Sequence, residues 1–384
     1  MDFDVAVIGA GPAGSTAARE CTKAGLRTVL VEKEKLPRFK PCGGGLTAKT
    51  LKALGFIVPK EYVLSRLSSV RLHYKELSIR YDSEETMVTT VERDGFDKLL
   101  ADKAVDAGAT LLEGTNVVEV KVSREGCEIT AVGGDITTSV VIGADGVNST
   151  VAKNVRPPFK PEDLVLAYEA EVPSKDAGGS VCDIYFDCGC MGYGWVFPKG
   201  NHTSVGLGGV LSGFRDSRRL FNEHMRRVGY NGDVDVHVHL IPIGSNRTET
   251  VSDRVILVGD AAGFAEPLTG EGIYYAIRSG QLAAKTITEA QSRGDYSEHA
   301  LQQYETAWRS EFGEEFRRSR KAMRGLFMAG PLSMRILFSN KEIIEKFSDI
   351  QAGRMTYKEF KNWFIRRTPH LMAGTAVKMV SGKH

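Results

Sequence analysis

Cysteine is scarce in this sequence, with six residues among 384, and no hydrophobic run approaches the ~18 residues that cross a membrane. Six cysteines do not form the disulfide framework of a small secreted domain, so a reduced, cytoplasmic protein is expected. No basic segment precedes the first apolar run, which argues against a signal peptide. Neither charge dominates: 50 lysines and arginines accompany 48 aspartates and glutamates. The resulting formal net charge of +2 argues against a nucleic-acid-binding protein.

Glycine is the residue in excess, with 41 copies that gather mainly in a few clusters. The rest of the composition, 42% hydrophobic and 26% charged, is ordinary for a globular protein with a sizeable core. No CxxC pair occurs among the cysteines, so no metal site is expected. The glycine clusters, and the strand patterns around them, therefore carry most of the functional information.

Alternating strands and helices open the sequence. Residues 3–9 form a short apolar run that ends in glycine, which is typical of a buried parallel strand. A helix at 12–24 and a strand at 28–32 complete one strand–helix–strand unit. Further segments are predicted in the same way: a helix at 95–107, strands within 110–142, alternating antiparallel strands at 66–91 and about 160–245, a buried strand at 254–260, and helices at 272–289 and beyond 300.

The first strand and helix enclose a GxGxxG motif made by Gly9, Gly11 and Gly14, with Ala13 before the last glycine. The first glycine makes a tight turn, the second lets backbone approach a pyrophosphate, and the third lets helix and strand pack closely. The N-terminus of the helix stabilises phosphates through its free N–H groups and its dipole. Glu32, which closes the second strand, can accept hydrogen bonds from a ribose. Together these features predict dinucleotide binding.

Two further segments, 142–149 (IGADGVNS) and 258–263 (VGDAAG), each follow a strand. With the first motif they resemble the flavoprotein group that includes p-hydroxybenzoate hydroxylase, and the resemblance implies a tightly bound FAD. It further implies that Asp260 contacts the ribityl chain and that backbone at Gly272 and Ile273 lies beside the isoalloxazine. By the same resemblance, Arg93 contacts the cofactor and the backbone of Val117 lines its adenine side.

The order of these segments predicts an α/β protein (α+β overall), in which a Rossmann-like FAD-binding domain is interrupted by a strand-rich substrate domain and followed by a helical C-terminal region. The FAD-binding domain is expected to be discontinuous, and the substrate domain is expected to be an antiparallel sheet. The expected ranges are 1–65, 92–158 and 246–300 for the FAD-binding domain, 66–91 and 159–245 for the substrate domain, and 301–384 for the helical region.

Two other segments resemble the geranylgeranyl reductases. Residues 39–46 (FKPCGGGL) are similar to a loop that these enzymes hold near the flavin, so Cys42, Gly43 and Gly45 are expected to contact the cofactor. Residues 193–198 (YGWVFP) resemble part of the family's substrate-cavity motif, with Tyr193, Trp195 and Phe197 as lining side chains. The family's pattern begins with a proline where Cys190 stands here, so this sequence departs from the pattern at that position.

The resemblance is strongest towards archaeal digeranylgeranylglycerophospholipid reductases. It implies FAD-dependent reduction of isoprenoid C=C bonds in geranylgeranylated glycerophospholipids, an oxidoreductase reaction on CH–CH groups in archaeal membrane-lipid biosynthesis. Cys42 is the candidate for an acid or positioning group, although a bound water serves equally well. The electron donor stays unidentified (NADPH, ferredoxin or another), since no second GxGxxG occurs. The basic segment 317–321 beside apolar residues suggests peripheral contact with the inner face of the cell membrane, or simply a solvated helix face.

Three alternatives stay open at this stage. An aromatic monooxygenase or halogenase can use the same fold, although the WxWxIP pattern of the halogenases is absent. An electron-transfer flavoprotein would pass electrons to a quinone or a protein without reducing a lipid. A lipid carrier with a vestigial flavin is disfavoured because every flavin motif is intact.

Overall fold

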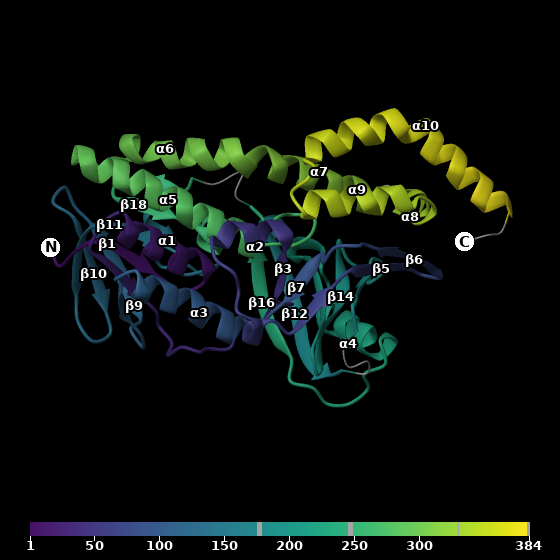
Figure 1. Ribbon diagram of the computed structural model, residues 1–384, viewed down its shortest axis with the longest axis horizontal. Coiled ribbons are helices and arrows are strands. Elements are labelled where there is room, and N and C mark those ends of the chain that lie inside the picture. The colour runs from purple at the N-terminus through teal and green to yellow at the C-terminus, as the bar shows by residue number, and fades with distance from the viewer. Residues whose placement is uncertain (175–178, 245–248, 329, 382–384) are drawn as a thin grey trace. The chain divides into compact units, whose positions relative to one another are not determined.

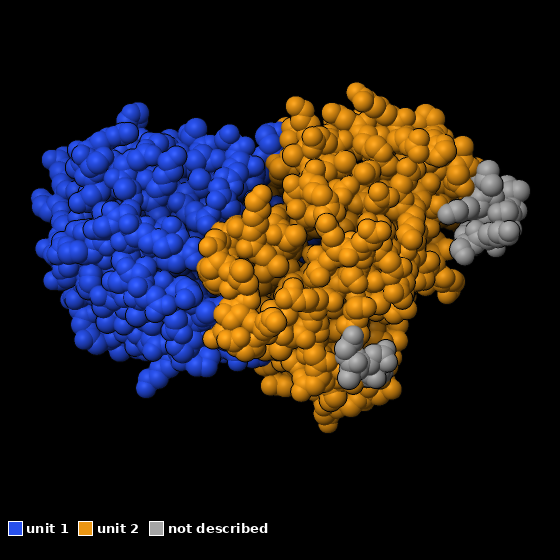
Figure 2. All heavy atoms as spheres, viewed as in Figure 1, with its two compact units in different colours: residues 1–40, 93–164, 241–314 blue, residues 41–92, 165–240, 315–384 orange. Residues whose placement is uncertain are grey.

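Each of the two structural units of this protein is assembled from three separate stretches of the chain (Figure 2). The computed structural model describes residues 1–174, 179–244, 249–328 and 330–381. Unit 1 comprises Met1–Lys40, Arg93–Leu164 and Ile241–Glu314, and unit 2 comprises Pro41–Glu92, Val165–Leu240 and Glu315–His384. The structure thus has the mixed α/β architecture that the sequence predicts, and many of its helices lie in the C-terminal region.

Unit 1 contains an eight-stranded sheet, counted over the described residues, with the order β17-β18-β11-β1-β2-β8 and with β10 and β9 added beside β11. Strands β18, β11, β1, β2 and β8 are parallel, and the first strand–helix–strand unit lies where the sequence predicts it. The strands span β1 Phe3–Ile8, β2 Thr28–Val31, β8 Thr110–Leu112, β9 Val117–Val122, β10 Cys127–Ala131, β11 Ile136–Gly143, β17 Val251–Ser252 and β18 Val255–Leu257.

The helices of unit 1 are α1 Pro12–Lys23, α3 Arg93–Asp106, α5 Ile273–Arg293 and α6 Glu298–Trp308, which continues into a π-helical turn at Arg309–Gly313. Helix α1 packs against both α3 and α5 (Figure 1). The contact with α5 is close because Gly280 has no side chain: a Cβ there would lie 2.5 Å from the carbonyl oxygen of Ala13. This packing holds the N-terminal ends of α1 and α5 in one unit.

Unit 2 contains a seven-stranded sheet, again counted over the described residues, in the order β16-β12-β15-β14-β13-β5-β6. The prediction of an antiparallel sheet is wrong for one pair of strands, because β5 and β13 are parallel. Alternating hydrophobicity gives the faces of a strand but not the direction of its neighbour, so the sequence did not reveal this. The strands span β5 Ser69–Tyr74, β6 Leu77–Asp82, β12 Leu164–Pro173, β13 Val181–Tyr185, β14 Gly192–Lys199, β15 His202–Val210 and β16 His237–Pro242.

A smaller sheet of β3, β7 and β4 lies in the same unit, with helix α2 following β3. Its elements span β3 Gly45–Thr47, α2 Ala48–Leu54, β4 Ser65–Leu67 and β7 Val88–Thr90. Val91 donates its backbone N–H to the carbonyl of Gly44 at 3.0 Å, so the end of β7 holds the glycine-rich loop that precedes β3.

The two faces of the large sheet in unit 2 are covered differently. Helix α4 (Ser217–Arg227) packs Phe221 and Met225 against apolar side chains of β12 and β15 on one face. On the other face, Met334 and Phe338 of α8 cover Leu72 of β5. The C-terminal helices are α7 Glu314–Met328, α8 Gly330–Ser339, α9 Lys341–Gln351 and α10 Tyr357–Ser381. Within the described ranges, none of the helices combines the length and the apolar character that a membrane span needs.

Candidate active site

The GxGxxG motif forms a tight turn between β1 and α1. Gly9 has φ +102°, and a Cβ there would lie 2.5 Å from the carbonyl oxygen of Ala144. At Gly14 a Cβ would lie 1.9 Å from the carbonyl oxygen of Gly9, so the motif closes only with glycine at both positions. Among the described residues, a Cβ at Gly11 would have only the Arg38 guanidinium within 4 Å, at 3.8 Å. The backbone at Gly11 is therefore open to the close approach of a ligand, as the motif predicts.

The N-terminal end of α1 carries no side-chain cap, and Pro12 and Ala13 begin the helix. Backbone N–H groups in a first helical turn have no acceptor within the helix, so they are available to phosphate oxygens. Uncapped N–H groups beside an open glycine fit the pyrophosphate of a dinucleotide.

Glu32 lies at the end of β2 and is 4% exposed. One carboxylate oxygen accepts the N–H of Ala10 at 2.9 Å, and the other accepts the N–H of Glu34 at 3.1 Å. Arg38 pairs with Glu32 at 3.4 Å and with the buried Asp97 at 3.1 Å. These contacts hold the carboxylate beside the GxGxxG turn, and a contact with ribose stays a prediction.

Arg93, at the start of α3, donates to both carboxylate oxygens of Asp97, at 2.8 and 2.9 Å. Sequence reasoning found Arg93 but missed Arg38 and Asp97, which join it to Glu32. Asp97 was visible only as the helix neighbour four residues after Arg93, and Arg38 gave no signal.

Asp260 lies in a 3-10 turn, Gly259–Ala262, that follows β18. Gly259 donates its N–H to Ser279 of α5 at 3.0 Å, and a Cβ on Gly259 would lie 2.8 Å from that of Ala13. Burial raises the pKa of Asp260, while Lys40 and Arg93 act in the opposite direction. The turn thus presents an acidic side chain beside the N-terminus of α1.

Gly272 and Ile273 mark the beginning of α5, which also has no side-chain cap. A Cβ on Gly272 would lie 3.7 Å from a carboxylate oxygen of Asp260, so the predicted ribityl and isoalloxazine residues are neighbours. Val117 begins β9 and pairs with Ala131, and nothing in these contacts tests its expected place beside the adenine.

The segment after β11 is held by hydrogen bonds within itself. Asp145 accepts hydrogen bonds from the Ser149 hydroxyl at 2.5 Å and from the N–H of Thr150 at 2.6 Å. The sequence singled out this segment as a flavin motif, and its aspartate also accepts the N–H of Val151 at 3.2 Å, where the short helical turn Val151–Asn154 begins.

In unit 2, the structure brings the Cys42 loop and the aromatic strand together. A Cβ on Gly43 would lie 2.6 Å from the ring of Phe197, and one on Gly44 would lie 3.3 Å from Cε of Lys199. Cys42 is half-buried, and its Sγ accepts the N–H of Gly44 at 3.4 Å. Gly45 then begins β3. The loop therefore packs directly on β14 because its glycines have no side chains.

The aromatic side chains of β14 form a row on one face of the sheet. The ring centroids of Tyr193 and Trp195 lie 6.1 Å apart, and those of Trp195 and Phe197 lie 6.5 Å apart. A Cβ on Gly206 of the neighbouring strand would lie 2.0 Å from the indole, so Trp195 extends across β15 at a glycine. Cys190, which stands in place of the family's proline, contacts the carbonyl of Gly208 through its thiol at 3.6 Å.

A hydrogen-bonded chain continues from this row to a buried acid. The indole N–H of Trp195 donates to Ser204 at 3.1 Å, and the Ser204 hydroxyl donates to Glu169 of β12 at 2.7 Å. Glu169 and Trp195 are both paired with Gly206, so all three lie in one row across the sheet and on the same face. Sequence reasoning missed Glu169 and Ser204; the only signal was an acidic residue within the alternating strand LVLAYEAEV.

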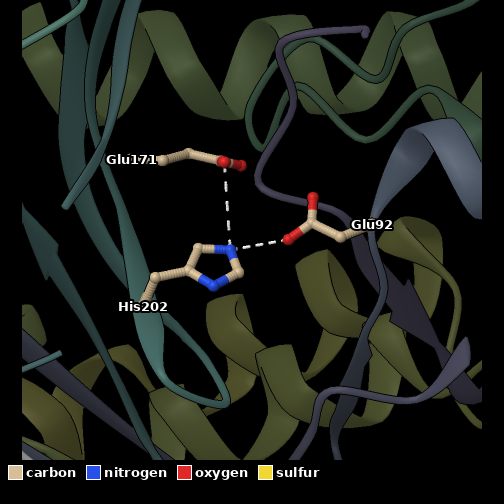
Figure 3. Close-up of side chains that lie close together, drawn as sticks. All are labelled: Glu92, Glu171 and His202. Carbon is tan, nitrogen blue, oxygen red and sulfur yellow. Dashed lines mark ion pairs between the residues drawn. The ribbon is translucent and has the colours of Figure 1, made fainter. Parts of the chain in front are cut away.

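Next to this chain lies a group of charged side chains. Lys199 is 1% exposed and pairs with Glu171 at 2.9 Å and with Glu92 at 3.3 Å. His202 contacts the other oxygen of Glu92 at 2.6 Å (Figure 3). The ligand atoms of Glu92, Glu171 and His202 lie within 4.8 Å of one another. Because the Lys199 ammonium already supplies positive charge to both carboxylates, we interpret the group as an ion-pair network.

The chain matches the model of the FAD binding domain over residues 2–177. It is 33% identical over 338 residues to a digeranylgeranylglycerophospholipid reductase of Methanothrix thermoacetophila, covering 83% of this chain and 86% of that protein. It is 32% identical over 308 residues to a geranylgeranyl diphosphate reductase of Rhodobacter capsulatus, covering 74% of this chain and 75% of that protein.

Among solved structures, a geranylgeranyl bacteriochlorophyll reductase-like protein of Thermoplasma acidophilum superposes with a TM-score of 0.80 at 25% identity, covering 97% of this chain and 98% of that one. A flavin-dependent brominase superposes with a TM-score of 0.71 at 18% identity, covering 96% and 99%, and this likeness shows the fold alone. The dinucleotide turn fits the cofactor of the matched domain, which is FAD. The chain therefore belongs to the geranylgeranyl reductase family of FAD-dependent oxidoreductases.

Proposed function

We propose that this protein reduces the C=C bonds of geranylgeranyl chains carried on a glycerophospholipid. The observation that carries the proposal is the row of Tyr193, Trp195 and Phe197, with the Cys42 loop packed against its end. The name of the Methanothrix relative supports the phospholipid as the carrier of the chains. The name of the Rhodobacter relative, geranylgeranyl diphosphate reductase, supports the geranylgeranyl group as substrate but names a diphosphate as its carrier.

The row of aromatic rings suits a substrate with a long apolar chain better than a compact aromatic substrate. Alternate side chains along a strand share a face, so three rings extend over about five residues, or roughly 13 Å at ~3.3 Å per residue. Each methylene that they bury gains about 0.8 kcal/mol, and the gain grows with the length of the chain. Recognition of this kind favours a C20 isoprenoid over shorter prenyl groups.

Bound FAD, in its reduced form, supplies the hydride that the reduction needs. The residues of unit 1 are proposed to hold it: the turn at Gly9–Gly14 binds the pyrophosphate, Asp260 binds the ribityl chain, and backbone at Gly272 and Ile273 lies by the ring. In unit 2, the Cys42 loop is proposed to lie against the flavin ring. Its backbone would exclude water from the alkene, and the Cys42 thiol would position the alkene. Electrons must come from a separate donor.

We also propose that α7 and α8 contact the lipid surface from which the substrate comes. Lys321 and Arg324 are exposed on α7, and the exposed Met328 lies four residues after Arg324 on the same side of the helix. Leu332 of α8 is 56% exposed as well. Cationic side chains beside exposed apolar ones favour an anionic lipid surface.

The test gives chemically reduced protein one candidate acceptor at a time without oxygen. A geranylgeranyl glycerophospholipid should reoxidise the flavin, which is followed by the return of its visible absorbance, and the fully saturated phospholipid is the matched control. In a second arm, simple phenols are supplied with oxygen. Hydroxylated phenol together with an unreactive lipid would overturn the proposal and favour a monooxygenase, and reoxidation only by a quinone would favour an electron-transfer flavoprotein.

A further inference from the structure

Glu169 is a buried carboxyl group in the middle of β12, and the residues assigned above to the flavin and to the lipid chain leave it without a role. It is 2% exposed. One of its oxygens accepts the Ser204 hydroxyl at 2.7 Å, and the other is buried and has no hydrogen-bond partner in the described part of the chain. A buried acid with one oxygen unpaired is costly to keep, so its position calls for a physical reason.

Glu169 is surrounded by residues that are proposed above to take part in the reduction. Glu169 lies in the same row as Trp195, separated from it by Gly206, which has no side chain. The backbone N–H of Cys42 comes near the carboxyl group without meeting hydrogen-bond geometry, and it favours the ionised form. Glu169 therefore neighbours both the Trp195 ring, which is proposed to line the substrate chain, and the Cys42 loop, which is proposed to lie on the flavin.

We propose that Glu169 is the acid that provides the proton for alkene reduction, an inference that rests on the function proposed above. The two electrons arrive with the hydride on one alkene carbon, and the π bond breaks. The carboxyl proton moves to the other carbon, which completes the new CH–CH unit and leaves Glu169 as a carboxylate. The proton is replaced from water before the next bond is reduced, so atoms and charge balance over the cycle.

The groups around Glu169 allow both the protonated acid and the carboxylate. Burial raises the pKa of Glu169 to about 7, whereas the Ser204 hydroxyl, the Lys199 ammonium and the Cys42 N–H favour the carboxylate, and Glu171 opposes it. An acid with a pKa close to the working pH is available to give its proton and to regain it. Lys199 stays charged: burial lowers its pKa, but Glu92 and Glu171 outweigh that effect.

The solvent side of this arrangement is the ion-pair network. The side chains of Glu92, Glu171 and His202 are 33%, 32% and 23% exposed, while Lys199 is buried beneath them. Glu171 follows Glu169 by two residues on the same face of β12, so the partly exposed network is next to the buried carboxyl group. It provides a polar route by which the proton is returned.

The experiment compares wild type with Glu169→Gln, and uses Glu76→Gln, in the exposed turn between β5 and β6, as a matched control. Reduced FAD-loaded protein is mixed with geranylgeranyl glycerophospholipid in a single turnover from pH 6 to pH 9. We expect the wild-type rate to fall above about pH 7, and the Glu169→Gln rate to be at least ~100-fold lower and independent of pH, as for the loss of a general acid. FAD content and circular dichroism establish that the variant is folded.

A second readout does not depend on activity. Infrared difference spectra of the protein between pH 5 and pH 9 should contain the C=O stretch of a neutral carboxylic acid that disappears near neutral pH. The band should be absent from Glu169→Gln and present in Glu76→Gln. Ser204→Ala, which removes a donor to the carboxylate, should move both the infrared midpoint and the rate profile to higher pH. A purely structural Glu169 would not produce this paired shift.

The outcomes separate the two proposals. If wild type reduces the lipid and Glu169→Gln does so at the same rate with the same pH profile, Glu169 is not the acid, and the proposed function stands. If wild type fails to reduce the lipid although its flavin is reduced, the proposed function falls and the role of Glu169 falls with it. If Glu169→Gln does not fold, Ser204→Ala decides: unchanged midpoints overturn the inference.

Discussion

Replacing Glu169 with glutamine should make the stability of the protein less dependent on pH. The amide keeps the shape of the carboxyl group and can still accept the Ser204 hydroxyl, but it carries no charge at any pH. Burial raises the pKa of Glu169 from the usual 4.5 to about 7. Between these values the folded protein holds a proton that the unfolded chain has released, so the free energy of unfolding falls as the pH rises.

The magnitude follows from the width of this interval. Each pH unit between the two pKa values changes the free energy of unfolding by about 1.4 kcal/mol. As the pH rises through the interval, the free energy of unfolding of wild type should therefore fall by about 3 kcal/mol relative to that of Glu169→Gln. Below pH 4.5 the contribution is fully present, and above about pH 7 it is lost. Other titrating groups are common to both proteins and cancel in the difference.

Urea unfolding between pH 5 and pH 8, followed by tryptophan fluorescence with excess FAD, measures this difference. Glu76→Gln is the control for a general effect of removing one negative charge. As the pH rises, we expect the free energy of unfolding of Glu169→Gln to increase relative to that of wild type by most of the ~3 kcal/mol. The free energy of unfolding of the control should differ from that of wild type by a constant amount at every pH. A constant difference between wild type and Glu169→Gln would contradict this prediction, because Glu169 would then keep one charge state throughout.

Three further substitutions test the site. Asp260→Ala removes the proposed ribityl acceptor and should weaken FAD binding by about 1.5–3 kcal/mol, measured by equilibrium titration of the apoprotein; unchanged affinity would exclude that contact. Cys42→Ser should retain FAD yet slow the reduction or change how many bonds are reduced, and a wild-type rate and product pattern would show that the thiol has no chemical role. Trp195→Ala should retain FAD but lose reductase activity, and in wild type shorter prenyl chains should be poorer substrates than geranylgeranyl chains. Equal use of all chain lengths by wild type would contradict the proposed contact of the chain with Tyr193, Trp195 and Phe197.

The dinucleotide part of the fold could be predicted from the sequence because its signals are local. The apolar run of β1, the glycines of the following turn and the acidic end of β2 are contiguous, and each has a backbone reason that the structure reproduces. Gly9 has a positive φ, and Gly14 has no room for a Cβ. The FAD cofactor and the membership of the reductase family are confirmed. The roles of the individual site residues stay predictions.

The row of Glu169, Gly206 and Trp195 could not be predicted in the same way. Each residue has an ordinary alternating position in its own strand, and only the pairing of β12, β15 and β14 brings them together. The pairing depends on turns and long-range packing, which a pattern within one strand does not contain. Lys199 illustrates the same limit, because a lysine at the end of a strand is usually exposed, whereas here two carboxylates hold it in a buried position.

Mass spectrometry of the lipid after a single anaerobic turnover is the most direct test of the central claim. Reduced, FAD-loaded protein is mixed with an equal amount of geranylgeranyl glycerophospholipid, and the lipid is then extracted. We expect the isoprenoid chains to gain the mass of one hydrogen molecule for each bond reduced, in proportion to the flavin oxidised, with the headgroup unchanged. Oxidised flavin with a lipid of unaltered mass would contradict this expectation.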